Sequence, residues 1–95
     1  MTLVDPDLRL ILGSEHIATS IGEETAIMSI ARSRYYAVGA VAGRIWELLG
    51  NPVTPREIVA ILVDEYDIGE EQCLNEVGSF VSELIEEGLV VEYQP

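Results

Sequence analysis

Three short stretches in the first half of the chain are rich in β-branched, aromatic or other apolar residues and are bounded by turn residues, a pattern that predicts β-strands. They span residues 16–21, 25–30 and 34–38. The connections between them are only a few residues long, so the three strands are expected to pair as an antiparallel meander.

After residue 39 the apolar positions recur at helical spacing. A first helix is expected at about 41–49, a second at 54–66 and a third at 70–87, with a strand-like tail at 89–93. Thr54, Pro55 and Glu57 form a capping box with proline at its preferred place, which is a specific signal for a helix start.

Residues 1–13 are interpreted as an N-terminal lead-in and 14–95 as a single domain. The predicted fold class is α+β and winged-helix-like: a three-stranded antiparallel sheet, three helices and a short terminal strand.

The composition is typical of one small globular domain. The chain has 95 residues, of which 48% are hydrophobic, and it contains no apolar run near the ~18 residues that a membrane helix needs. Its first ten residues hold two aspartates and a proline where a signal peptide would carry basic charge. No membrane association is indicated, and a cytoplasmic location is expected.

The charge is strongly acidic and unevenly distributed. There are 17 acidic and 5 basic residues, for a net charge of −12, and residues 57–95 hold eleven of the acids and no base. Nucleic-acid binding usually needs clustered lysine and arginine, so this class of partner is disfavoured. A basic peptide or protein surface is the natural partner, although solubility alone would also explain many of the acids.

Side chains that could carry catalysis or bind a metal are scarce. His16 is the only histidine, and no nucleophile motif surrounds Cys73 or any serine. Cys73 lies on a predicted helix among acids, which favours the unreactive thiol, so a place in the core or in a groove is expected. The acids at 64–67 lack the spacing of a calcium loop. The sequence therefore predicts a protein that is not an enzyme, with no metal and no cofactor.

Tyr35 and Tyr36 lie side by side on the third predicted strand, after which the chain leaves the sheet. This strand is expected at a sheet edge, with unpaired N–H and C=O groups. Because side chains alternate along a strand, only one tyrosine can face the helices, and Tyr36 shares its face with Val38. A groove between this edge and an apolar helix would accept an extended peptide as an added strand. An ordinary edge strand whose tyrosines close the core is the alternative.

Glu86 and Glu87 lie in the last turn of the third predicted helix, where the helix dipole disfavours acids. We interpret them, together with Glu83, as a candidate site for a basic partner. The alternative is a solvated helix face.

The run IMSIARSRYYAVGAVAGRIWELLG, which starts at Ile27, resembles the central part of the peptide-chaperone family typified by PqqD, the carrier in pyrroloquinoline-quinone biosynthesis. RYYAV resembles the family's third strand, IWELL its first apolar helix block, TPREIVAILVDEY its second helix, and VSELIEEGLV its last helix and exit. The resemblance covers roughly residues 14–92. Gly39 and Ser29 depart from it, since the family often has Asn and Asp there. Within the family, the chain is most similar to the stand-alone leader-binding proteins of bacterial lasso-peptide biosynthesis.

The resemblance implies a non-catalytic RiPP recognition element, a domain that binds the leader segment of a ribosomally made precursor peptide. The leader would add as a β-strand between the third strand and the third helix. It would then be delivered to a separate leader protease, with the cyclase as a further candidate partner. The residues expected to line the peptide site are Arg34, Tyr35, Tyr36, Ala37, Val38, Cys73, Leu74, Val77, Phe80, Val81 and Leu84.

Other function classes stay open at this point. A winged-helix transcription regulator would need basic side chains on its recognition helix, and residues 70–88 contain none. An acyl carrier protein is acidic and of this size, but the Asp-Ser-Leu-like step that carries its prosthetic arm is missing. An acidic protein-interaction adaptor is a third alternative.

Overall fold

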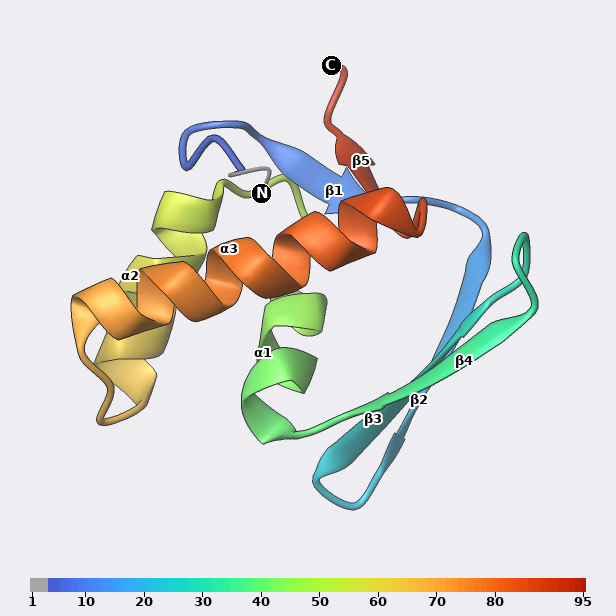
Figure 1. The fold of residues 1–95 in the computed structure, drawn as a ribbon, viewed down its shortest axis with the longest axis horizontal. Helices are drawn as coiled ribbons and strands as arrows, with labels where there is room; N and C mark the ends of the chain where they lie inside the picture. Colours follow the sequence, from blue (N-terminus) through green and yellow to red (C-terminus); the bar gives the residue numbers. More distant parts are fainter. Residues whose placement is uncertain (1–3) are drawn as a thin grey trace.

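The computed structural model describes residues 4–95 and arranges them as three helices with two small sheets (Figure 1). In chain order the elements are β1 (Leu10–Leu12), β2 (His16–Ile21), β3 (Glu24–Ser29), β4 (Arg34–Val38), α1 (Ala40–Leu48), α2 (Pro55–Glu65), α3 (Glu70–Glu86) and β5 (Val90–Glu92).

The larger sheet consists of β2, β3 and β4, all antiparallel, with β3 in the centre. Across it, Ala18 pairs with Ile27, and Ile27 pairs with Tyr36. This sheet, the three helices and the short terminal strand confirm the predicted α+β fold class.

β1 was not predicted. It pairs with β5 in a separate two-stranded antiparallel sheet, with Leu10 opposite Glu92. Leu10 is 1% exposed, and it exchanges two backbone hydrogen bonds with Val53, of 2.8 and 3.0 Å. Much of the expected lead-in is therefore anchored in the core, while its residues 1–3 lie outside the described part. Three apolar residues in a row show no period, so the pattern could not distinguish this strand from a loop.

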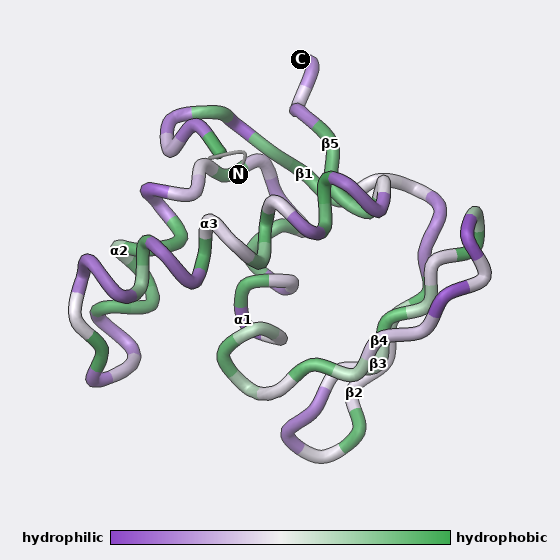
Figure 2. Tube along the Cα trace, viewed as in Figure 1, coloured by the Kyte–Doolittle hydropathy of each residue, from purple (hydrophilic) through white to green (hydrophobic). Residues whose placement is uncertain are grey.

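The core lies between the helices and the inner face of β3. Along α2 and α3, hydrophobic and hydrophilic stretches alternate, as expected for amphipathic helices (Figure 2). α2 begins with the predicted capping box, in which Thr54 accepts a hydrogen bond from the Glu57 N–H and the Glu57 side chain accepts one from the Thr54 N–H. The largest fully buried side chains include Leu10, Ile27, Leu49, Ile58, Leu62, Val77, Val81 and Leu89.

Two glycines position the elements beside β4. A Cβ on Gly43 would lie 2.7 Å from the Thr25 hydroxyl oxygen, so the missing side chain lets α1 pack closely against β3. Gly88 has a φ of +75°, a left-handed conformation that ends α3 and turns the chain toward β5. Among residues 4–95, no helix is long and apolar enough to cross a lipid bilayer.

Candidate functional site

β4 forms one edge of the three-stranded sheet. It pairs with β3 on one side only, so its other side offers backbone N–H and C=O groups to a further strand. The chain leaves the sheet after Val38 and enters α1, as the sequence pattern predicts. The edge is five residues long and contains no proline, so it has the groups needed for strand addition.

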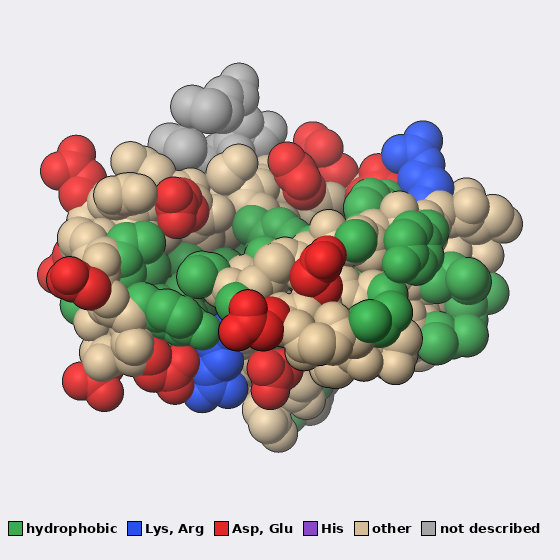
Figure 3. Space-filling view, turned by 90° about the horizontal axis from the view of Figure 1, so that it is seen from below, with side chains coloured by type: hydrophobic (Ala, Val, Ile, Leu, Met, Phe, Trp, Pro, Cys, Tyr) green, Lys and Arg blue, Asp and Glu red, His purple; other side chains and the backbone are tan. Residues whose placement is uncertain are grey.

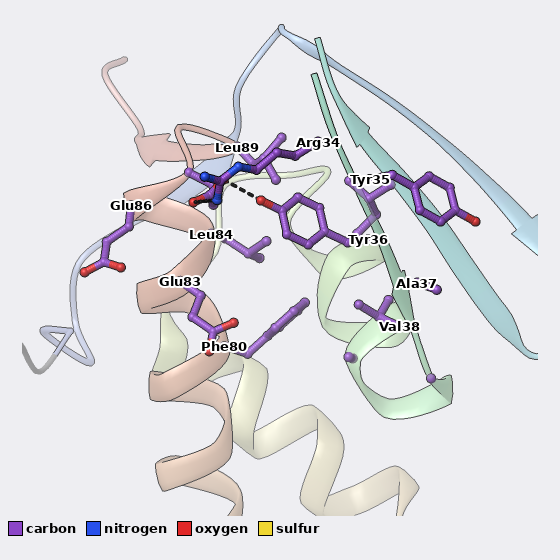
Figure 4. Close-up of a pocket in the computed structure, with 14 residues that line it drawn as sticks. Arg34, Tyr35, Tyr36, Ala37, Val38, Phe80, Glu83, Leu84, Glu86 and Leu89 are labelled. Carbon is purple, nitrogen blue, oxygen red and sulfur yellow. Dashed lines mark hydrogen bonds and ion pairs between the residues drawn. The ribbon is translucent and has the colours of Figure 1, made fainter. Parts of the chain in front are cut away.

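A groove of about 670 Å³ runs between β4 and the C-terminal half of α3 (Figure 4). One wall is β4 and the other is formed by Phe80, Glu83, Leu84 and Glu86 of α3. The groove is open, and apolar surface predominates in its lining. Ile27, Gly39, Ala42, Glu87 and Leu89 complete it.

The two tyrosines point to opposite sides of β4. Tyr36 reaches across the groove toward the end of α3, and its hydroxyl donates a hydrogen bond to the Glu87 carboxylate (Figure 4). Tyr35 points away and is 62% exposed. This orientation agrees with the alternation predicted from Val38.

Glu87 is bound by side chains from β4 and from the loop that precedes it. Besides the Tyr36 hydroxyl, its carboxylate lies 3.3 Å from Nη1 of Arg34 and 3.7 Å from Nη1 of Arg32. The Tyr36 hydrogen bond, aided by these two arginines, lowers the pKa of Glu87, and the same bond raises the pKa of the Tyr36 phenol. The cluster ties the end of α3 to β4 at one end of the groove.

This pairing changes the interpretation of the acids at the end of α3. Glu87 was predicted to be available for a basic partner, but its carboxylate already pairs with Arg32 and Arg34, which compensate its charge. Glu83 and Glu86 also line the groove, and within residues 4–95 neither of them takes part in an ion pair. The acidic wall that a ligand would meet therefore consists of Glu83 and Glu86.

The structure brings most of the predicted site residues together, but not all of them. Cys73, Val77 and Val81 are 1%, 0% and 0% exposed and belong to the core. Burial raises the pKa of the Cys73 thiol, as expected for an unreactive side chain. Leu74 is exposed and lines a separate, smaller hollow between α2 and α3. The predicted residues that do line the groove are Arg34, Tyr35, Tyr36, Ala37, Val38, Phe80 and Leu84.

Several residues that line the groove were not predicted from the sequence. Leu89 follows the end of α3, and Ala42 lies on the first turn of α1, so neither belongs to an apolar stripe that the helical period marks. Gly39 and Ile27 also line the groove and were not among the predicted site residues. Their place in the lining follows from how α1 packs beside β3, which no local pattern encodes.

The groove has the chemistry of a binding site for an extended chain. An open strand edge supplies backbone pairing, while apolar and aromatic side chains supply pockets. In the described part of the chain, no cluster of histidine, cysteine or acidic residues is arranged to hold a metal ion. His16 lies apart from the groove and packs edge-on against Trp46, with ring centroids 5.0 Å apart.

The comparisons with known proteins agree with this description. A solved structure of TbiB1 in complex with the TbiA(beta) leader peptide is 24% identical to this chain, with a TM-score of 0.79 over 90% of this chain and 99% of that one. A structure of a lasso peptide synthetase B1 complexed with the leader peptide is 17% identical, with a TM-score of 0.75 over 86% and 96% of the two chains. At these identities the likeness shows a shared fold.

A search of curated proteins gave no match. The family model described as coenzyme PQQ synthesis protein D (PqqD) matches residues 24–90, well over half of the chain, and the protein therefore belongs to the PqqD family.

Proposed function

We propose that this protein binds the leader segment of a ribosomally made precursor peptide, of the lasso-peptide class, and delivers it to a separate leader peptidase. The observation that carries the proposal is the unpaired edge of β4 beside the apolar groove against α3. Membership of the PqqD family supports it, as do two proteins of the same fold that were solved with leader peptides. In this proposal the protein is a non-catalytic partner of the enzymes that act on the precursor.

The binding mode follows from the groove. Backbone groups of β4 would pair with the leader and set its register, because main-chain hydrogen bonds fix the alignment of an added strand. Alternate leader side chains would then point toward α3, where Tyr36, Phe80, Leu84 and Leu89 offer apolar contacts. The Glu87 cluster would limit the groove at one end.

Strand addition makes a direct prediction about amide exchange. Adding a synthetic leader peptide is expected to slow hydrogen exchange at residues 35–38, because amides that now face solvent would become hydrogen-bonded. Residues 17–20 of β2, the opposite edge of the same sheet, are the matched control and should keep their exchange rates. Mass spectrometry or NMR would measure both segments. Binding without added protection at β4 would contradict strand addition while leaving the groove as a contact surface.

The acidic wall predicts a salt effect on leader binding. Glu83 and Glu86 would attract a basic leader residue over a Debye length of about 8 Å at physiological salt. Raising the salt concentration from low to several hundred millimolar is therefore expected to slow association several-fold and to leave dissociation almost unchanged. The double variant Glu83→Gln/Glu86→Gln should reproduce the slowing at low salt, as measured by stopped-flow fluorescence.

A control variant separates steering from general charge. Glu71→Gln/Glu76→Gln removes the same charge from the other half of α3, away from the groove. Its association rate should stay close to that of the wild type. If both double variants slowed association equally, the rate would depend on the net charge of −12 and not on the position of the acids. If neither variant slowed association, Glu83 and Glu86 would only form a solvated helix face.

A further inference from the structure

The face of the three-stranded sheet that is turned away from the helices carries a row of large apolar side chains. Ile17, Met28 and Tyr35 are cross-strand partners, one on each strand. They are 59%, 45% and 62% exposed, so no element of the described chain covers them. The helices lie on the other side of this sheet (Figure 1), and hydrophobic side chains gather at the sheet end of the molecule (Figure 3).

The apolar and polar side chains of β2 lie on the opposite faces from those expected when one face of a sheet packs on the core. Such a strand normally turns its apolar side chains to the core and its polar ones to solvent. In β2, Ile17 and Ile21 face outward, while Ala18 and Ser20 lie on the helix side. Exposure to solvent does not explain why two isoleucines lie on the outer face of one strand. Burial of this face under a partner protein would explain it.

The outer face is also nearly free of charge, although 17 acids and 5 bases occur in the chain. Arg34 lies on the inner side of β4, bound to Glu87. Glu24 is the one acidic or basic residue among the eight outward positions, which are Ile17, Thr19, Ile21, Glu24, Ala26, Met28, Tyr35 and Ala37.

The apolar row is continuous with the candidate leader site. Tyr35 ends the row, and it also belongs to the edge strand and to the lining of the groove. A peptide paired with β4 would place one of its outward side chains beside Tyr35, because cross-strand partners lie on the same face. The bound leader would thus add one side chain to the row. A protein that packs on this face would contact both this protein and its bound leader.

We infer that the outer face of the sheet is the docking surface for the enzyme that removes the leader from the bound precursor. The contact on the enzyme would be an apolar patch, matched to the uncharged face. A second copy of this chain is a poorer partner for this surface, because each copy has a net charge of −12 and the two copies would repel each other. The inference rests on the proposed leader binding, since the enzyme is recruited to the loaded protein.

The test removes the apolar row and leaves the groove intact. In the double variant Ile17→Thr/Met28→Thr, threonine keeps a β-branched residue at 17 and a strand-favouring one at 28, and neither position lines the groove. The matched control is Leu74→Gln, because Leu74 is an apolar side chain of similar exposure, 40%, on a different face. Each protein is mixed with a labelled synthetic leader, with full-length precursor, and with the purified leader peptidase of the same biosynthetic cluster.

Three measurements distinguish the outcomes. The double variant should bind the leader within about twofold of the wild type, yet its rate of leader removal by the peptidase should fall about tenfold or more, the scale of losing central apolar contacts. The control should retain both. Unchanged leader removal would overturn the inference, as would wild-type protein that sediments as a dimer and becomes monomeric in the double variant. A wild-type protein that fails to bind the leader would instead overturn the proposed function itself.

Discussion

Replacing Tyr36 by alanine is expected to weaken leader binding by about 5- to 150-fold, which corresponds to about 1–3 kcal/mol, the range for truncating an aromatic anchor at an interface. The ring projects across the groove and packs against the core, and its hydroxyl is held by Glu87. The substitution would therefore remove both a wall of the pocket and a link between β4 and α3. Isothermal titration calorimetry with a synthetic leader would measure the loss.

Two further variants show which part of Tyr36 matters. Tyr36→Phe keeps the ring and loses only the hydrogen bond to Glu87, so it should retain most of the affinity. Tyr35→Ala truncates the neighbouring ring, which points away from the groove, and should cost less than Tyr36→Ala. A larger loss from Tyr35→Ala would mean that the leader is recognised mainly from the outer face of the sheet, and that the groove is not its main contact.

Local patterns were sufficient to predict the element order and the orientation of β4. Tyr36 faces the groove because it shares the two-residue period with Val38, and that period does not depend on the rest of the fold. The start of α2 was equally predictable, since Thr54 and Glu57 form a capping box from neighbouring residues alone.

What could not be predicted depends on contacts between distant residues. Leu10 belongs to the core only because β1 pairs with β5 and bonds with Val53. Glu87 was misinterpreted for the same reason, since Arg34, which compensates its charge, lies 53 positions earlier in the chain. Long-range pairings of this kind leave no periodic trace in the sequence.

The apolar stripe of α3 shows the same limit within one helix. Its period marks Val77 and Phe80 alike as apolar positions, but α3 packs against α2 and also forms a wall of the groove. Val77 is fully buried, whereas Phe80 is partly exposed and lines the groove. The sequence predicted the stripe and could not assign its members to core or groove.

Val77→Ala and Phe80→Ala are expected to separate stability from binding. Val77→Ala leaves a void in the core and should lower the free energy of unfolding by roughly 1–3 kcal/mol, while the affinity for the leader stays within about twofold. Phe80→Ala removes a groove wall and should weaken leader binding by about 1–3 kcal/mol, with a loss of stability smaller than its loss of affinity. Urea denaturation and leader titration of the same protein samples would provide both quantities. If Val77→Ala reduced affinity as much as Phe80→Ala at temperatures where both variants are folded, the leader would have to reach the core of the domain, and the groove would be deeper in the bound state than in the free protein.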